Sequence, residues 1–171
     1  MTIRPLRFAL LTCLVILHTP SWAEWGDFEF EFEQDKPWVE MATQLPPPPK
    51  ADNLIPFTVS SITRNRHFVD AASISVGADK VVRYTVVVEM VGGARNVSFE
   101  GLRCESAERR LYAYGQPDGS WSRARQSQWE TIKLRSLLSY QKPLYEDLFC
   151  PDGIRVRDGV EAARNLRQAA Q

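Results

Sequence analysis

The stretch from Val81 to Val91 constrains the fold more than any other part of the sequence. Every second residue in it is apolar, from Val82 to Met90, and polar residues such as Arg83 and Glu89 lie between them. An apolar period of two is typical of a β-strand that buries one face. A Gly-Gly pair follows directly, and glycine tolerates the positive φ angles of a tight hairpin. The stretch is therefore the strongest strand prediction in the sequence, and the turn after it predicts an antiparallel hairpin.

Further strands are expected on both sides of this one. Residues 54–59 predict an edge strand, because Pro56 cannot donate to a central ladder. Residues 95–104 predict the partner strand, and a shift of its apolar phase at Gly101 predicts a bulge. A second hairpin is expected from strands at 110–115 and 120–123, which flank the turn-forming residues 116–119.

The C-terminal third indicates helices. Residues 143–149 predict a short helix that ends at the Pro-Asp-Gly break of 151–153. Asp158 and Glu161 have the spacing of a capping box ahead of an apolar stripe, which predicts a final amphipathic helix. The expected fold is α+β: a single domain with an antiparallel β-sheet, short C-terminal helices and one disulfide.

Residues 1–23 have the three parts of a secretory signal peptide. Arg4 and Arg7 precede an apolar run at 9–17, which is too short for a transmembrane helix of about 20 residues. Small residues at Ser21 and Ala23 predict cleavage after Ala23. The alternative is a lipoprotein attached through Cys13, although the residues before Cys13 do not match a lipobox. We therefore expect a periplasmic protein with no transmembrane span, with peripheral membrane association as a possibility.

Cleavage would leave two cysteines, Cys104 and Cys150. An even cysteine count in an exported chain predicts a disulfide. Two buried free thiols are the alternative.

Residues 24–50 form an acidic, proline-rich arm ahead of an α+β domain at 51–171. The arm carries seven acidic residues and one lysine between Glu24 and Glu40. Residues 35–41 predict the start of a short helix, and Pro46 to Pro49 predict a stiff polyproline spacer. The apolar residues of the arm at 28, 30 and 32, with the acids around them, are expected to fold back on a basic face of the domain.

Several segments resemble the cryptic neisserial protein family of exported proteobacterial proteins. The resemblance covers nearly all of the chain after residue 23, and it is carried by residues 36–38, 53–57, 68–84, 96–104, 111–125 and 149–153. It implies an exported protein of a Gram-negative bacterium. The family is uncharacterised, so the resemblance implies no catalytic residues.

Signs of an enzyme are weak, and whether the chain is one stays uncertain. Asp70, Glu100, Glu105 and Glu108 supply carboxylates, but no spacing brings two of them together. His67 is the only histidine after residue 23, and its place beside apolar residues favours a strand position. No phosphate-binding loop or catalytic motif is present, and neither a cofactor nor a metal is predicted.

The most suggestive constellation lies between residues 109 and 135, where arginines and aromatic residues interleave. Arginine suits phosphate and carboxylate, and flat aromatic rings suit sugars. A solvated basic face over an aromatic core is the alternative. The candidate binding residues are Arg109, Arg110, Tyr112, Tyr114, Trp121, Arg123, Arg125 and Trp129.

These features predict a non-enzymatic exported cell-envelope protein that binds an envelope protein or an anionic glycan. Nucleic acid is not expected as a partner, because it is rarely available to an exported protein. The alternative is a small periplasmic hydrolase that uses carboxylate residues. A cleft lined by two facing acids would favour the hydrolase, and a flat basic-aromatic sheet face would favour the binding protein.

Overall fold

The computed structural model describes residues 37–171. The predicted signal peptide of residues 1–23, the alternative lipidation site at Cys13 and the arm as far as residue 36 lie outside the described residues. From Trp38 onward the chain forms one unit.

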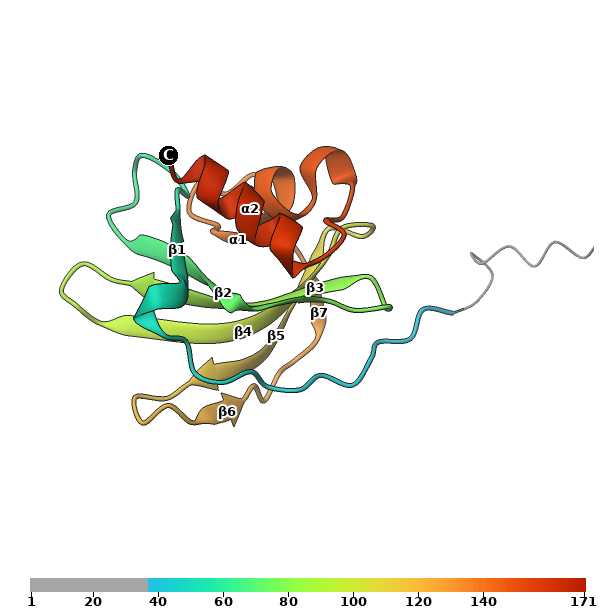
Figure 1. Ribbon diagram of the computed structural model, residues 1–171, viewed down its shortest axis with the longest axis horizontal. Helices are drawn as coiled ribbons and strands as arrows, with labels where there is room; N and C mark the ends of the chain where they lie inside the picture. The colour runs from blue at the N-terminus through green and yellow to red at the C-terminus, as the bar shows by residue number, and fades with distance from the viewer. Residues whose placement is uncertain (1–36) are drawn as a thin grey trace, which may run out of the picture. The chain divides into compact units, whose positions relative to one another are not determined.

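An antiparallel sheet of seven strands is the centre of the fold (Figure 1). Six strands follow one another in sequence order across the sheet, and β7 pairs with β5 alongside β6. The strands are β1 (Leu54–Phe57), β2 (Arg66–Val76), β3 (Val81–Glu89), β4 (Arg95–Arg103), β5 (Glu108–Gly115), β6 (Trp121–Arg123) and β7 (Trp129–Thr131).

The strand predicted at 81–91 and both predicted hairpins are confirmed. β3 pairs with β2 on one side and with β4 on the other, and β1 lies at the edge as Pro56 requires. Gly92 and Gly93 both have positive φ in the turn between β3 and β4. Local alternation and turn chemistry therefore determine most of the sheet.

Helices cover one face of the sheet, which we call the helix-side face (Figure 1). Val82, Tyr84 and Val86 of β3 are fully buried beneath them and form the main core with Leu144, Phe149 and Leu166. The helical elements are α1 (Gln141–Pro143), the π-helical turn η3 (Leu144–Phe149) and α2 (Gly159–Ala169), with short 3-10 turns at Ala51–Asn53 and Pro151–Gly153. The α+β fold class is confirmed.

The disulfide and the final helix also match their predictions. Cys104, after β4, is bonded to Cys150, after η3, with 5.6 Å between their Cα atoms. The disulfide therefore ties the helical layer to the sheet. In α2 the Asp158 side chain caps the first turn by accepting a 2.8 Å hydrogen bond from the Glu161 backbone N–H.

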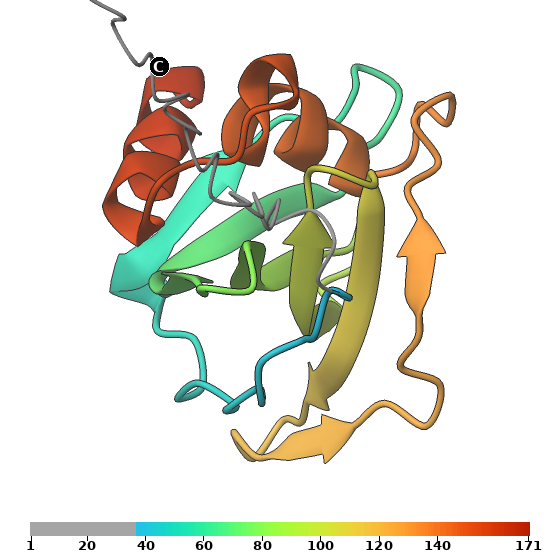
Figure 2. The ribbon, with the colours of Figure 1, turned by 90° about the vertical axis from the view of Figure 1, so that its right-hand side faces the viewer.

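The opposite face of the sheet is covered by residues 38–50, which we call the strap (Figure 2). The strap lies along the sheet and contains no helix, so the predicted helix start does not form in the described residues. Contacts with the sheet outweigh the local helix signal. The proline run is not a free spacer either, because the Pro46 carbonyl accepts a 2.7 Å hydrogen bond from the Trp121 indole and Pro48 lies beside Gly119.

The predicted bulge at Gly101 is corrected. β4 pairs with β3 without a break, and the irregularity lies in β5, where Tyr112 is the extra residue opposite Phe99 and Glu100. The apolar phase of β4 changes because the strand has two covered faces. Phe99 packs on the strap side against Tyr112, whereas Leu102 belongs to the core beneath the helices.

No helix among the described residues is long and apolar enough to cross a membrane.

Candidate functional site

The alternation of β5 divides the predicted binding residues between the two faces of the sheet. Arg109 is paired with Leu102, whose side chain lies in the helix-side core, and Arg110 is paired with Gly101 on the strap side. Tyr112 also lies on the strap side, where its ring contacts Phe99. The eight predicted residues therefore do not form one continuous face.

On the strap side the predicted residues surround a single carboxylate of the strap. Glu40 accepts a 2.7 Å hydrogen bond from the Tyr112 hydroxyl and a 3.0 Å hydrogen bond from the Trp129 indole N–H. Arg110 forms an ion pair with the same carboxylate, and Arg83 lies 3.8 Å from it. Three of the predicted residues are thus occupied by the protein's own chain.

Two further aromatic contacts hold the strap. Trp121 donates to the Pro46 carbonyl, and Trp38 packs edge to face on Trp129 with 5.8 Å between the ring centroids. The guanidinium of Arg103 stacks 3.9 Å from the centroid of the Trp38 ring, a favourable cation–π contact. The strap-side aromatics are therefore structural in this arrangement.

A buried ion pair anchors the start of the strap. The carboxylate of Asp79 takes two hydrogen bonds from Arg83, of 2.5 and 3.1 Å, and a 2.9 Å hydrogen bond from the Met41 backbone N–H. Burial alone would raise the pKa of Asp79, but the hydrogen bonds from Arg83 and Met41 outweigh it and lower the pKa. Burial raises the pKa of Tyr112, and its hydrogen bond to Glu40 adds to the increase. The charged form of Asp79 is therefore favoured in this cluster.

The other predicted residues line a surface groove beside β5, which we call the outer groove. It has a volume of about 510 Å³ and is bordered by β6, β7 and the connection between them. Its walls include four predicted residues together with amide and hydroxyl side chains. The lining residues that bear on binding are Arg109, Tyr114, Ser122, Arg123, Arg125, Gln126 and Gln128.

Positive charge dominates the outer groove. Arg109 forms a 2.9 Å ion pair with Glu130, the only acid in the lining. Arg123 and Arg125 are exposed and make no ion pair within residues 37–171. Tyr114 is half exposed beside them and presents an aromatic surface. The groove therefore offers two free guanidinium groups, an aromatic ring and several neutral hydrogen-bonding groups.

A second hollow adjoins the groove, and we call it the inner cavity. It has a volume of about 680 Å³ and shares Arg109, Leu111 and Tyr114 with the outer groove. Its wall carries Glu100, which is almost fully buried. The Glu100 carboxylate accepts hydrogen bonds from the hydroxyls of Ser98, at 2.7 Å, and Tyr140, and a 3.5 Å contact from Tyr84.

Burial perturbs the ionisable neighbours of Glu100. The pKa values of Tyr84 and Tyr140 are raised by burial first and by the charge of Glu100 second. Both hydroxyls therefore stay protonated and donate to the carboxylate. His67 lies against the Tyr140 ring, with 6.0 Å between centroids, and burial lowers its pKa. Its predicted place in a strand is correct, because it belongs to β2.

The acids considered for a hydrolase do not come together. Asp70 is buried in β2 and is paired with Thr85, a strap-side position, whereas Glu100 faces the inner cavity. Glu105 pairs with Lys80, and Glu108 pairs with Arg103. In the described part of the chain, no three His, Cys, Asp or Glu side chains are grouped closely enough to hold a metal ion.

Sequence reasoning missed the residues that organise both faces. Glu40 lies in a segment interpreted as an arm, and Tyr140 lies in a connection with no periodic pattern. Arg83 offered a usable signal, because an arginine within the strongest predicted strand needs a partner wherever that strand is buried. Its partner Asp79 is only four residues away in the sequence.

The fold and its hollows define a class of protein: a disulfide-linked α+β domain with a basic groove at the edge of an antiparallel sheet. The chain belongs to the CNP1-like family, whose sequence profile matches residues 33–167. This match confirms the resemblance to cryptic neisserial protein seen in the sequence. No curated protein and no solved structure matches the chain.

Proposed function

We propose that this protein is an exported cell-envelope protein that binds an anionic glycan in the outer groove. The observation that carries the proposal is the pair of exposed arginines, Arg123 and Arg125, beside the half-exposed ring of Tyr114. Guanidinium groups bind sulfate, phosphate and carboxylate, and the neutral groups beside them suit sugar hydroxyls. The disulfide supports export, because such bonds persist in oxidising compartments.

The chemistry of the inner cavity favours binding over hydrolysis. Glu100 is the one carboxylate in the cavity lining, and its oxygens already accept hydrogen bonds from three hydroxyl groups. A glycosidase of the usual kind needs a second acid facing the first across the bond to be cleaved. A glycan that enters from the groove would instead meet hydroxyl and amide groups suited to hydrogen bonding.

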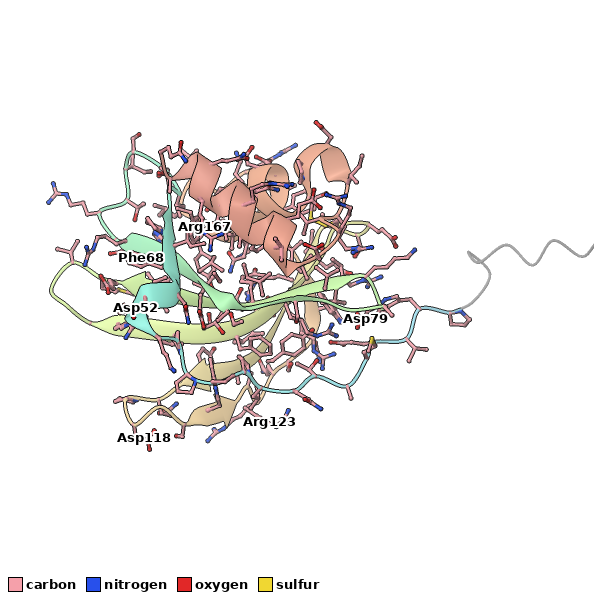
Figure 3. All side chains as sticks on the ribbon, in the orientation of Figure 1. Asp52, Phe68, Asp79, Asp118, Arg123 and Arg167 are labelled. Atoms are coloured by element: carbon pink, nitrogen blue, oxygen red, sulfur yellow. A yellow bond between two sulfur atoms is a disulfide. The ribbon has the colours of Figure 1, made fainter. Side chains whose placement is uncertain are left out.

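The proposal is tested with a fluorescein-labelled heparin oligosaccharide as the probe and anisotropy as the readout. The variant Arg123→Ala/Arg125→Ala removes both free guanidinium groups. The matched control, Lys50→Ala/Arg167→Ala, also removes two exposed charges, and Arg167 lies on α2, away from Arg123 (Figure 3).

We expect the groove variant to bind about tenfold more weakly, because each exposed ion pair contributes about 1 kcal/mol or less and 1.4 kcal/mol corresponds to tenfold. The control should stay within about twofold of the wild type. The difference should shrink as salt rises to physiological strength, where screening acts over about 8 Å. Equal losses in the two variants would reject the groove as the binding site.

A further inference from the structure

Exposed aliphatic side chains gather at the tips of three loops. The exposed large hydrophobic residues of the described chain number eleven, and five of them belong to the β1–β2 loop, the β3–β4 hairpin and the connection from β7 to α1. Their exposed fractions range from 41% to 67%. These residues, which we call the apolar tips, are Ile62, Met90, Val91, Leu137 and Leu138.

The three loops meet around the mouth of the inner cavity. The backbone N–H of Val91 donates a 3.3 Å hydrogen bond to the Asn65 side chain, which joins the hairpin to the β1–β2 loop. Met90 and Leu138 both line the cavity, together with Thr63 of the β1–β2 loop. The first two loops extend from the same end of the sheet (Figure 1). Two of the five apolar tips therefore line the hollow, and each of the other three is next in sequence to a lining residue. We call these three loops the rim.

The rim is also basic. Residues 58–66, 90–96 and 136–142 contain no aspartate or glutamate and carry four basic residues. Two of these pair with acids on neighbouring strand or helix positions, Arg66 with Glu89 and Lys142 with Glu146. Arg64 and Arg95 are exposed and make no ion pair in the part of the chain that the structure describes.

We infer that this rim docks the protein on an anionic lipid bilayer. Aliphatic tips on separate loops can enter the boundary between headgroups and acyl chains, where burying apolar surface is favourable. Arginines beside them then lie at headgroup depth and attract anionic lipid. The complete absence of acids from the three segments matches a negatively charged surface. A protein interface would also suit methionine and arginine, but the five tips include no aromatic anchor, and aromatic residues are enriched at protein interfaces.

This inference is independent of the proposed glycan binding. The outer groove uses Arg123 and Arg125, which are not part of the rim. The two sites adjoin through Arg109, Leu111 and Tyr114, so a docked protein would hold its groove close to the membrane surface.

The test is flotation of the chain from Glu24, which keeps the whole unit from Trp38 to Gln171, with vesicles of phosphatidylethanolamine and phosphatidylglycerol. The tip variant is Ile62→Ser/Val91→Ser/Leu138→Ser. The matched control is Val39→Ser/Ile154→Ser/Val160→Ser, which removes three side chains that are exposed to 71% or more elsewhere on the molecule. A charge variant, Arg64→Ala/Arg95→Ala, is compared with Arg123→Ala/Arg125→Ala. Thermal melting is measured for each variant, so that a loss of fold is recognised.

We expect the tip variant to float at least fivefold less than the wild type, and the matched control to float within twofold of it. The charge variant should also lose at least fivefold, whereas the groove variant should float normally even if it no longer binds heparin. Equal flotation with vesicles in which phosphatidylcholine replaces phosphatidylglycerol would overturn the inference. Equal losses of flotation in the tip variant and its control would also overturn it. So would release of the protein from the vesicles by free glycerol phosphate. A dimer in solution that only the tip variant disrupts would show that the rim contacts a second copy of the chain instead.

Discussion

The carboxylate of Glu40 accepts a hydrogen bond of 2.7 Å from the hydroxyl of Tyr112, although 72 residues separate the two in the chain. This contact joins the strap to the bulged residue of β5. Tyr112 is the extra residue where the register between β4 and β5 shifts, and its hydroxyl reaches the Glu40 carboxylate. The hydrogen bond between these two residues therefore links the strap to β5.

The first prediction is that Glu40→Ala loosens the strap. The change leaves Arg110 and the Tyr112 hydroxyl without their common acceptor in a mostly buried site, so we expect a loss of about 2 kcal/mol in the free energy of unfolding. Chemical denaturation measures the loss, and hydrogen exchange should increase in residues 38–50. The control Glu105→Ala breaks an exposed pair with Lys80 and should cost less than about 1 kcal/mol. Unchanged exchange in the strap of Glu40→Ala would contradict the prediction.

The second prediction concerns Gly101, which has no room for a side chain. A Cβ atom at this position would lie 2.4 Å from the Tyr112 hydroxyl oxygen and 2.9 Å from its ring. Gly101→Ala should therefore displace Tyr112 and cost about 1–3 kcal/mol of stability, as overpacking does. Thermal or chemical denaturation measures the cost.

The control for Gly101 is the same substitution in a Tyr112→Ala background. There the added methyl group meets no ring, so the two changes should couple by 0.5 kcal/mol or more, in the range of about 0.5–3 kcal/mol seen for residues in contact. Additive effects would show that the glycine is needed for another reason.

Gly101 also shows where sequence reasoning succeeds and where it fails. The break in the pattern of β4 is real, and an isolated glycine in a strand signals either a bulge or a close approach. The sequence favoured the bulge, but the structure has the close approach, made by a residue of the next strand. The hairpins were predictable because their signals are local, whereas this contact depends on a neighbouring strand.

The packing of the strap on the sheet could not be predicted either, because it also depends on contacts between residues that are distant in the sequence. Glu40 accepts hydrogen bonds from Tyr112 and Trp129, which lie 72 and 89 residues away in the sequence. Nothing near Glu40 in the sequence indicates these contacts. Strand alternation alone, however, could have divided the predicted basic face, because Arg109 and Arg110 are neighbours and must point to opposite sides. The sequence therefore indicated the residue types of the candidate site, but the prediction wrongly placed all eight residues on one face of the sheet.

The third prediction is that the disulfide stabilises the fold. Its 46-residue separation corresponds to about 4 kcal/mol in the chain-entropy estimate, which is an upper value for the loss in Cys104→Ala/Cys150→Ala. Alanine is used because both cysteines are buried and a serine hydroxyl would need a partner. Urea denaturation with and without a reductant provides the measurement, and the alanine variant should not respond to the reductant. Two reactive thiols in the native, unreduced protein would contradict the bond.

The last prediction is a loss of stability on mild acidification that depends on His67. Burial in the wall of the inner cavity lowers the pKa of His67 from 6.5, so the unfolded chain binds a proton more readily than the folded one. The sign follows from linkage: the contribution of His67 is complete above about pH 6.5 and falls as the pH decreases toward its folded pKa.

The experiment for His67 is urea denaturation of the wild type and of His67→Phe between pH 7.5 and pH 5. Phenylalanine suits the site because Phe57 and Tyr140 flank the imidazole, and it cannot titrate. We expect the wild type to lose stability relative to the variant as the pH falls through about 6.5. Asp70→Asn is the control, because burial raises the pKa of Asp70 and its titration acts in the opposite direction. That control should keep the decline, and a decline of equal size in His67→Phe would show that another group is responsible.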